Sequence, residues 1–353
     1  MKKVVLAYSG GLDTSFCVKY LTKELGYEVY TALANTGGFS AEELKAVEER
    51  AYALGAKQHV NIDVTSDYYG KCIKYMVMGN VLRNKTYPIS VSSERTFQAL
   101  AIVNYANSIG ADAIAHGSTG AGNDQVRFDL TFEVFAPQIE IITPTRDMKL
   151  TREYEINYLK ENGYEADFTK LEYSINKGVW GTSVGGKETL CSATNLPDTA
   201  YPSQLQKEGT ESLEIEFKNG EVVGVNGEAL SGVAAINKLE AIGSAWAIGR
   251  DTHVGDTIVG IKGRVVLRLQ LLCLSSRHTS FWRSTHSQSG SSTGRISSVL
   301  GTVCLCTRLC TLSPLCVISR SSWRTASATY LVRCLSLFVP ILSLWLVSSL
   351  HTT

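Results

Sequence analysis

The last quarter of this 353-residue chain contains no acidic residue. All 33 aspartates and glutamates lie at or before Asp256, and no lysine follows Lys262. Residues 265–353, the tail, contain eight arginines and no acid, whereas residues 1–264 contain 26 basic and 33 acidic residues, a net charge of −7. Soluble domains carry charges of both signs on their surfaces, so we expect the two parts to differ in kind.

Cysteine is scarce in residues 1–264, where only Cys17, Cys72 and Cys191 occur. Three widely spaced cysteines predict buried, reduced thiols rather than a disulfide framework. The chain begins with a strand-like run of six apolar or small residues, which is too short for a signal peptide, so we expect a cytoplasmic location. The formal net charge of +1 gives no indication of a nucleic-acid partner.

Strand-like and helix-like patterns alternate over residues 1–165, which predicts an α/β domain with a parallel sheet and helices on both faces. Strands are predicted over 3–8, 27–34, 57–64, 111–117 and 139–144. Helices are predicted over 14–25, 40–54, 66–78, 93–109 and 151–162. Residues 166–264 predict an α+β domain, with a hairpin over 212–227, a helix over 234–250 and a strand over 256–266.

The first motif, "AYSGGLDTS" (Ala7–Ser15), lies between the first predicted strand and helix. Gly10 and Gly11 would let backbone N–H groups converge on an anion at a helix N-terminus, and Asp13 would either cap that helix or help to hold Mg²⁺. The motif lacks the lysine that serves γ-phosphate transfer, so it favours attack at an α-phosphate with pyrophosphate leaving. The alternative is a tight strand-to-helix turn without a ligand.

The second motif, "AHGSTGAGNDQVRFD" (Ala115–Asp129), follows a later predicted strand and is dense in glycine and polar side chains. Its composition suits a zwitterionic amino acid, with Arg127 for a carboxylate and Asp124 for an ammonium group. The alternative is a polar loop in which Asp124 and Arg127 pair with each other. Because both motifs follow strands of one parallel sheet, we expect them at the same edge.

Ser9 to Ser15 resembles the SGGxDS/T loop of the ATP pyrophosphatases, enzymes that split ATP into AMP and pyrophosphate. The second motif resembles the H-G-x-T-G-x-G-N-D-x-x-R-F pattern of argininosuccinate synthases. The resemblance covers residues 3 to about 265 and implies an adenine-nucleotide alpha-hydrolase-like domain followed by a synthetase domain, here incomplete. It also implies a homotetramer, although a chain with this tail is not expected to assemble.

The resemblance implies a set of site residues, with Asp13, Asp124 and Arg127 as the catalytic ones and ATP and Mg²⁺ as cofactors. ATP would be bound by Ala7, Tyr8, Ser9, Gly10, Gly11, Leu12, Asp13, Thr14, Ser15, Ala34 and Gly117. Aspartate would be bound by Thr119, Asn123 and Asp124, and citrulline by Tyr87, Ser92, Asn123, Arg127, Ser174 and Ser183. One departure is Gly255, which stands where the family usually has a citrulline-contacting glutamate.

The implied reaction is argininosuccinate synthesis, a step of arginine biosynthesis. The ureido oxygen of citrulline attacks the α-phosphorus of ATP, and the amine of aspartate then displaces AMP from citrullyl-AMP. Alternatives are another ATP pyrophosphatase, such as a tRNA-thiolating enzyme, or an inactive ATP-binding remnant. A catalytic cysteine pair and a basic surface would indicate the tRNA enzyme, and residues 1–264 have neither.

The tail does not resemble the family. Its charge-free run Cys334–Leu350 has 17 residues, near the lower limit for a membrane helix, and "CLCTRLC" has the cysteines of a metal site. We favour a shifted reading frame after about Val265, with a disordered tail and no membrane partner. Permitted codons for "HSQSGSSTGR" (286–295) read in another frame as LSKWQQYWK, which is similar to the family at that point. The coding DNA tests this hypothesis.

Overall fold

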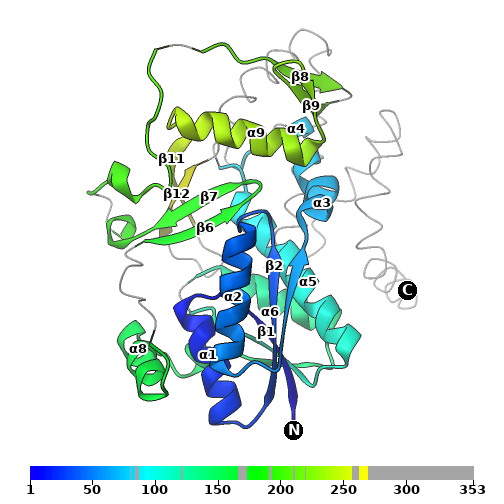
Figure 1. The fold of residues 1–353 in the computed structure, drawn as a ribbon, viewed down its shortest axis with the longest axis vertical. Coiled ribbons are helices and arrows are strands. Elements are labelled where there is room, and N and C mark those ends of the chain that lie inside the picture. The colour runs from blue at the N-terminus through cyan, green and yellow to red at the C-terminus, as the bar shows by residue number, and fades with distance from the viewer. Residues whose placement is uncertain are drawn as a thin grey trace, which may run out of the picture.

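The computed structural model describes residues 1–268 except 80, 84–86, 121, 166–172, 191–192, 210, 219 and 257–261. Two parts are visible in Figure 1, a lower α/β part and an upper part built from hairpins and α9. The predictions for Cys191 and for residues 269–353, including the shifted frame, lie outside the described residues.

The first part contains five strands and most of the helices. Its strands are β1 (Lys3–Ala7), β2 (Glu28–Asn35), β3 (Gln58–Asp63), β4 (Ala113–His116) and β5 (Glu140–Ile142). Its helices are α1 (Leu12–Lys23), α2 (Ala41–Leu54), α3 (Thr65–Tyr68), α4 (Lys74–Gly79), α5 (Ser90–Ile109), α6 (Asp124–Phe135), α7 (Pro144–Asp147) and α8 (Arg152–Glu161), with a π-helical turn at Tyr69–Ile73.

The five strands form one parallel sheet in the order β3-β2-β1-β4-β5. The chain runs outward from β1 to β3 and then returns to the other side of β1 with β4, so the strand order reverses between β1 and β4. In open α/β sheets this reversal opens a crevice at the carboxyl ends of the strands, where ligands bind. The first and second motifs follow β1 and β4, so both begin at this crevice.

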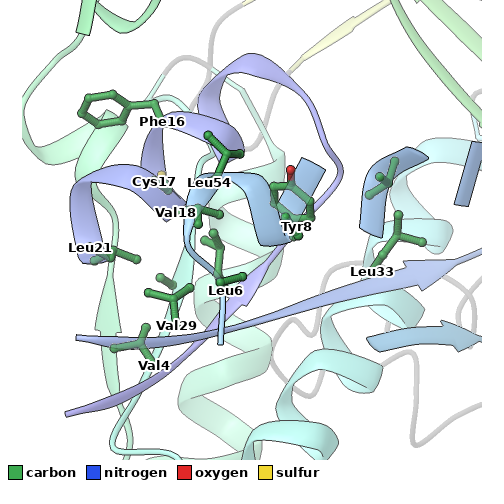
Figure 2. Packing of buried hydrophobic residues seen from close by; sticks show 14 of the residues in the cluster. Val4, Leu6, Tyr8, Phe16, Cys17, Val18, Leu21, Val29, Leu33 and Leu54 are labelled. Carbon is green, nitrogen blue, oxygen red and sulfur yellow. The ribbon is translucent and has the colours of Figure 1, made fainter. Parts of the chain in front are cut away.

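One face of the sheet is covered by α1, α2 and α8, as Figure 1 shows for α1 and α2. Val4 and Leu6 of β1 point to this face, where Phe16 and Leu21 of α1 pack over them (Figure 2). Phe16 is fully buried and stacks on Tyr20 at 5.6 Å between ring centroids. This packing fixes α1, and therefore the first motif, against the sheet.

The opposite face is covered by α5 and α6. Val5 of β1 alternates with Val4 and Leu6 and packs with Ile102 of α5 and Phe132 of α6. Both faces of β1 are thus apolar, as expected for a central parallel strand. The α/β fold predicted for residues 1–165 is confirmed.

The second part contains two antiparallel sheets and one long helix. Its elements are β6 (Ser174–Gly178), β7 (Gly181–Gly185), β8 (Ile215–Lys218), β9 (Glu221–Val225), β10 (Glu228–Ala229), α9 (Gly232–Ala245), β11 (Arg250–Asp256) and β12 (Lys262–Arg268). The strand orders are β10-β9-β8 and β11-β12-β7-β6. Its core also includes Tyr68, Ile73 and Met76, so residues near α3 and α4 pack with α9 rather than with the parallel sheet.

Several predicted elements differ from the observed ones. The helix predicted over 66–78 is broken by the π-helical turn into α3 and α4. The single strand predicted over 256–266 is wrong, because this stretch contains the end of β11 and part of β12. These two strands pair antiparallel, with Asp256 opposite Lys262. The hairpin β6–β7 was not predicted, since its glycine-rich sequence lacks apolar alternation. The hairpin β8–β9 was predicted correctly, and α9 was predicted in the right place, but it ends at Ala245 and Arg250 already belongs to β11.

Candidate active site

The first motif forms the turn from β1 into α1. Gly10 adopts φ +74, a left-handed conformation that favours glycine, and Gly11 is the N-cap of α1 without a side-chain cap. Asp13 therefore does not cap the helix but lies in its first turn. Thr14 Oγ1 donates to the Gly11 carbonyl at 3.2 Å, and the Gly11 amide donates to Ser9 Oγ at 3.4 Å. The resulting turn places hydroxyls and a helix N-terminus together.

The two motifs are in direct contact. Ala7 at the end of β1 is paired with His116 at the end of β4, so the next residues of each strand leave the sheet side by side. A Cβ on Gly117 would lie 3.1 Å from the carbonyl carbon of Asp13 and 3.2 Å from the amide nitrogen of Thr14. Gly117 is thus the residue whose lack of a side chain lets the second motif lie against the first turn of α1.

The carboxyl group of Glu155 lies next to that of Asp13 in the first motif. Glu155 of α8 is 1% exposed and accepts a hydrogen bond from Thr145 Oγ1 at 3.2 Å. Burial, and next the neighbouring Asp13 carboxylate with which it shares a hydrogen bond, raise the pKa of Glu155 to about 8. At neutral pH the pair therefore holds a proton, which lets Glu155 donate to Asp13 and fix the Asp13 carboxylate at the loop.

This pair predicts a pH dependence of stability. An unfolded glutamate has a pKa near 4.5, so between that pH and about 8 the folded chain holds a proton that the unfolded chain has lost. The wild-type free energy of unfolding should therefore fall, by a few kcal/mol, as pH rises through this window. Glu155→Gln keeps a hydrogen-bond donor but does not titrate. Its melting temperature should therefore rise relative to that of the wild type between pH 5 and pH 8.5. The exposed Glu153→Gln, on the same helix, is the control; parallel profiles for Glu155→Gln and wild type would contradict the shared proton.

The second motif is only partly a loop. The helix α6 begins at Asp124, so Asp124 and Arg127 stand in its first turn, where the sequence had suggested a continuous loop. Asp124 Oδ1 accepts from Arg127 Nη1 at 3.1 Å, and Asp124 Oδ2 accepts from Arg95 Nε at 3.0 Å. Burial acts to raise the pKa of Asp124, but the two guanidinium groups outweigh it and hold that pKa below its usual range. The pairing of Asp124 with Arg127 is thus present, but within a larger cluster.

Tyr87 and Ser92 lie beside this cluster. Burial raises the pKa of Tyr87, while a hydrogen bond with Ser92 and the charge of Arg127 oppose the rise. The hydrogen bond places the Tyr87 hydroxyl beside Ser92, and the effect of the Arg127 charge requires that guanidinium group to be nearby. Four predicted site residues from two separate stretches of the sequence are therefore neighbours: Tyr87, Ser92, Asp124 and Arg127.

The predicted serine pair lies on the β6–β7 hairpin. Ser183 is opposite Asn176 in the antiparallel register, and Ser174 is two residues before Asn176, so the three side chains share one face of the hairpin. Asn176 Oδ1 accepts from Arg95 Nη2 at 2.8 Å, which turns this face toward the cluster. Ser183 is buried and Ser174 is exposed.

The remaining predicted residues lie at the crevice edge. Ala34 is buried near the end of β2, and its carbonyl accepts from Gln98 Nε2 at 3.4 Å. Tyr8 is buried, and its amide donates to the Ala32 carbonyl at 2.9 Å. Asn123 is the N-cap of α6, and Thr119 is exposed between Gly117 and that cap.

Sequence reasoning missed several residues of the site. Arg95 is not among the predicted site residues, yet it donates to Asp124, Asn176 and Gln98 Oε1, the last at 2.7 Å. Glu94 is buried and accepts from Thr36 Oγ1 at 2.6 Å. The available signal was the charged pair Glu94-Arg95 inside an otherwise uncharged helix, since buried charges occur mostly as paired or functional groups.

Gly255 lies on β11, opposite Gly263 of β12. Strand alternation puts Gly255 on the same face of β11 as His253, whose ring meets Tyr87 edge-on at 5.6 Å.

A network of hydrogen bonds around His116 and Gln125 holds the backbone of the second motif. The amide of Ser118 donates to His116 Nδ1 at 3.2 Å, so His116 carries its proton on Nε2 and donates it to Asp129 at 2.8 Å. Gln125 Nε2 donates to the Gly120 carbonyl at 2.6 Å, and Gln125 Oε1 accepts from Arg146 Nη1 at 3.2 Å. These bonds hold the glycine-rich backbone in one conformation.

Two further predictions concern the cysteines and the membrane. Cys17 and Cys72 are buried, as predicted, and neither is in a disulfide among the described residues; burial raises the pKa of the Cys17 thiol to about 12. Within the described residues, none of the helices has the length and apolar character needed to cross a membrane.

Comparison with known proteins gives a consistent result. The family model for the N-terminal HUP domain of argininosuccinate synthase matches residues 3–165, and the model for its C-terminal domain matches residues 173–285. The second match runs beyond Val265, where the resemblance seemed to end in the sequence.

Curated argininosuccinate synthases are similar over most of the chain. The enzyme of Pyrobaculum aerophilum is 38% identical over 269 residues, which cover 75% of this chain and 67% of the relative. The enzyme of Methanocaldococcus jannaschii is 39% identical, covering 74% and 66%, and that of Xanthomonas campestris is 36% identical, covering 78% and 71%. The match thus spans about two thirds of the length of the first two relatives. The chain belongs to the argininosuccinate synthase family, carbon–nitrogen ligases of arginine biosynthesis that use ATP.

Proposed function

We propose that this chain condenses citrulline with aspartate, using ATP and releasing AMP and pyrophosphate. The observation that carries the proposal is the contact between the two motifs, in which Gly117 lies against the first turn of α1. A nucleotide at the first motif would then have its α-phosphate beside the amino-acid cluster around Asp124. Alignment of reactants in this way supplies much of the rate enhancement when no side-chain nucleophile is needed.

The first motif is proposed to hold ATP. Backbone N–H groups at Gly10 and Gly11, with the hydroxyls of Ser9, Thr14 and Ser15, offer donors to phosphate oxygens at the N-terminus of α1. Tyr8, Leu12 and Ala34, with Ala7, complete the predicted ATP contacts, and Gly117 borders them from the second motif. Mg²⁺ is an oxygen-seeking ion that commonly uses one carboxylate and substrate phosphates, and Asp13 with its neighbouring hydroxyls fits that set. When bound, the ion would neutralise phosphate charge.

The cluster around Asp124 is proposed to hold the two amino acids. Arg127 is assigned to a citrulline carboxylate, with Tyr87, Ser92, Asn123, Ser174 and Ser183 completing the citrulline contacts. Thr119, Asn123 and Asp124 are assigned to aspartate, where Asp124 would bind the ammonium group and orient the amine that attacks once a proton has been lost to solvent. The ureido oxygen forms a bond to the α-phosphorus as the bond to pyrophosphate breaks, and the amine later displaces AMP. Asp124 and Arg127 would act through charge placed before the reaction.

The test is AMP formation by the full chain with ATP and citrulline, with and without aspartate. The expected result is pyrophosphate release that depends on citrulline, with AMP and argininosuccinate formed together when aspartate is also present. AMP formation that requires tRNA would favour a thiolating enzyme, and ATP binding without turnover would favour an inactive remnant. The network of Arg95, Asp124 and Asn176 favours the ligase, because it brings amino-acid-binding groups from α5, α6 and β6 together. We further propose a cytoplasmic location, and that this chain does not assemble into the homotetramer of the family.

A further inference from the structure

The first motif has no lysine of its own, but a guanidinium group reaches it from α2. Arg50 Nη1 donates a hydrogen bond to the carbonyl oxygen of Gly10. A Cβ on Gly10 would lie 3.3 Å from that nitrogen and 3.0 Å from Val47 Cγ2, so α2 packs directly over the turn. Figure 1 shows α1 and α2 side by side on the same face of the sheet.

The position of α2 is well determined by its own sequence. Ser40 and Glu43 form a capping box at its start, and Gly55 ends it in the left-handed conformation. Val47, Ala51 and Leu54 bury its inner face in the core. Arg50 precedes Ala51, so its side chain leaves the helix at the rim of the core and lies half-buried beside the turn.

Arg50 differs from the other arginines near the two motifs in its partners. Arg95 and Arg127 share Asp124, and Arg146 pairs with Asp129. Among the described residues, no carboxylate forms an ion pair with Arg50, and its one described hydrogen bond uses one of five N–H donors. Its charge is thus not neutralised by an acid and is available to an anion.

The charge also acts locally. Burial raises the pKa of Tyr8 to about 12, and the positive charge of Arg50 works in the opposite direction. The guanidinium is therefore close to the Tyr8 hydroxyl as well as to Gly10, on the side of the motif that faces α2.

We propose that Arg50 is the cationic phosphate-binding residue of the first motif, and that it binds the two phosphates of ATP that leave as pyrophosphate. The inference rests on the proposed function, which places ATP at this motif. A helix N-terminus contributes only about half a unit charge, whereas the distal phosphates carry several negative charges. A guanidinium fork matches two phosphate oxygens at once, which a backbone cradle alone does not do.

The positive charge of Arg50 is needed most when pyrophosphate leaves. When the citrulline oxygen bonds to the α-phosphorus, the bond from that phosphorus to the bridging oxygen breaks, and its electron pair stays on pyrophosphate. Arg50 stabilises the negative charge that develops there and transfers no proton. A residue from a neighbouring helix thereby replaces the lysine that Gly-rich loops of γ-phosphate-transferring proteins carry within the loop.

The experiment compares ATP and AMP binding to the full chain by isothermal titration calorimetry. AMP lacks the two distal phosphates, so Arg50→Gln should weaken ATP binding roughly tenfold or more and change AMP binding less than twofold. Arg50→Lys restores a positive charge and should recover part of the ATP affinity. Lys45→Gln removes one charge from an exposed position of the same helix and should leave both affinities unchanged.

Two results would overturn the inference. Equal weakening of ATP and AMP by Arg50→Gln would mean that Arg50 only supports the turn through Gly10. An unchanged ATP affinity would mean that the phosphates bind elsewhere. If Arg50→Gln does not fold, the Arg50→Lys variant decides. A tenfold or larger loss of both ATP and AMP affinity in Arg50→Lys would reject a role of the charge. Retention of most of the ATP affinity would support that role. If the wild-type chain binds neither nucleotide, the proposed ATP site itself is rejected. If the wild type binds ATP and Arg50→Gln binds it with the same affinity, only this inference is rejected.

Discussion

Replacing Gly38 with alanine should lower the melting temperature of the protein by roughly 6–12 °C. A Cβ at this position would lie 1.9 Å from the carbonyl oxygen of Lys177 and 2.6 Å from its carbonyl carbon. These are backbone atoms that cannot rotate away, so the loop after β2 and the hairpin β6–β7 must separate. Overpacking of this kind costs about 3 kcal/mol, and each kcal/mol shifts the melting temperature of a domain of this size by roughly 2–4 °C.

The same substitution should also impair substrate binding. Val179 donates its amide to the Thr36 carbonyl at 2.7 Å, and Asn176 of the same hairpin holds Arg95. Movement of the hairpin would loosen that bond, so the KM for citrulline should rise more than the KM for ATP. Gly70→Ala is the matched control, because a Cβ at Gly70 meets nothing within 4 Å and the residue is helical. A Gly38→Ala protein that melts within 2 °C of wild type would show that the contact is not tight.

Replacing Asp124 with asparagine should lower ligase activity by roughly 100-fold or more. Asp124 holds Arg95 and Arg127, whose side chains are only 10% and 11% exposed. The variant removes the carboxylate that pairs with Arg127 and leaves Arg95 with only Glu94, at 3.6 Å. Removing one partner of a fully buried pair costs about 3–5 kcal/mol, but Asp124 is 38% exposed and partly screened by water, so we expect on the order of 1–2 kcal/mol of lost stability.

The Asp124 variant should also differ in its response to acid. Because the folded pKa of Asp124 is lowered, its contribution to stability is present above the unfolded pKa and is lost as pH falls toward the folded value. The stability difference between wild type and Asp124→Asn should therefore narrow below about pH 4. Asp67→Asn, which removes an exposed carboxylate paired with Lys71, is the control and should change stability by less than about 0.5 kcal/mol. A variant that retains half of the activity would reject the role of Asp124.

The amino-acid sequence by itself determined the parallel α/β domain and the two motifs. Apolar runs at helix and strand periods identify β1 to β5, and the glycines of both motifs are local requirements of a turn and a close approach. These signals lie within short stretches, so they can be read without knowing what packs against them. The break in composition near Val265 belongs to the same class of observation.

Tertiary structure decided which residues meet. Nothing in the sequence near Gly10 indicates that Arg50, forty residues later, reaches its carbonyl, or that Asn176 holds Arg95. The helix start at Asp124 likewise depends on α6 packing against α5 and the sheet, since its polar first turn carries no apolar period. Such contacts depend on how helices and hairpins pack over the sheet, which is fixed by the shape of the whole core rather than by any local pattern.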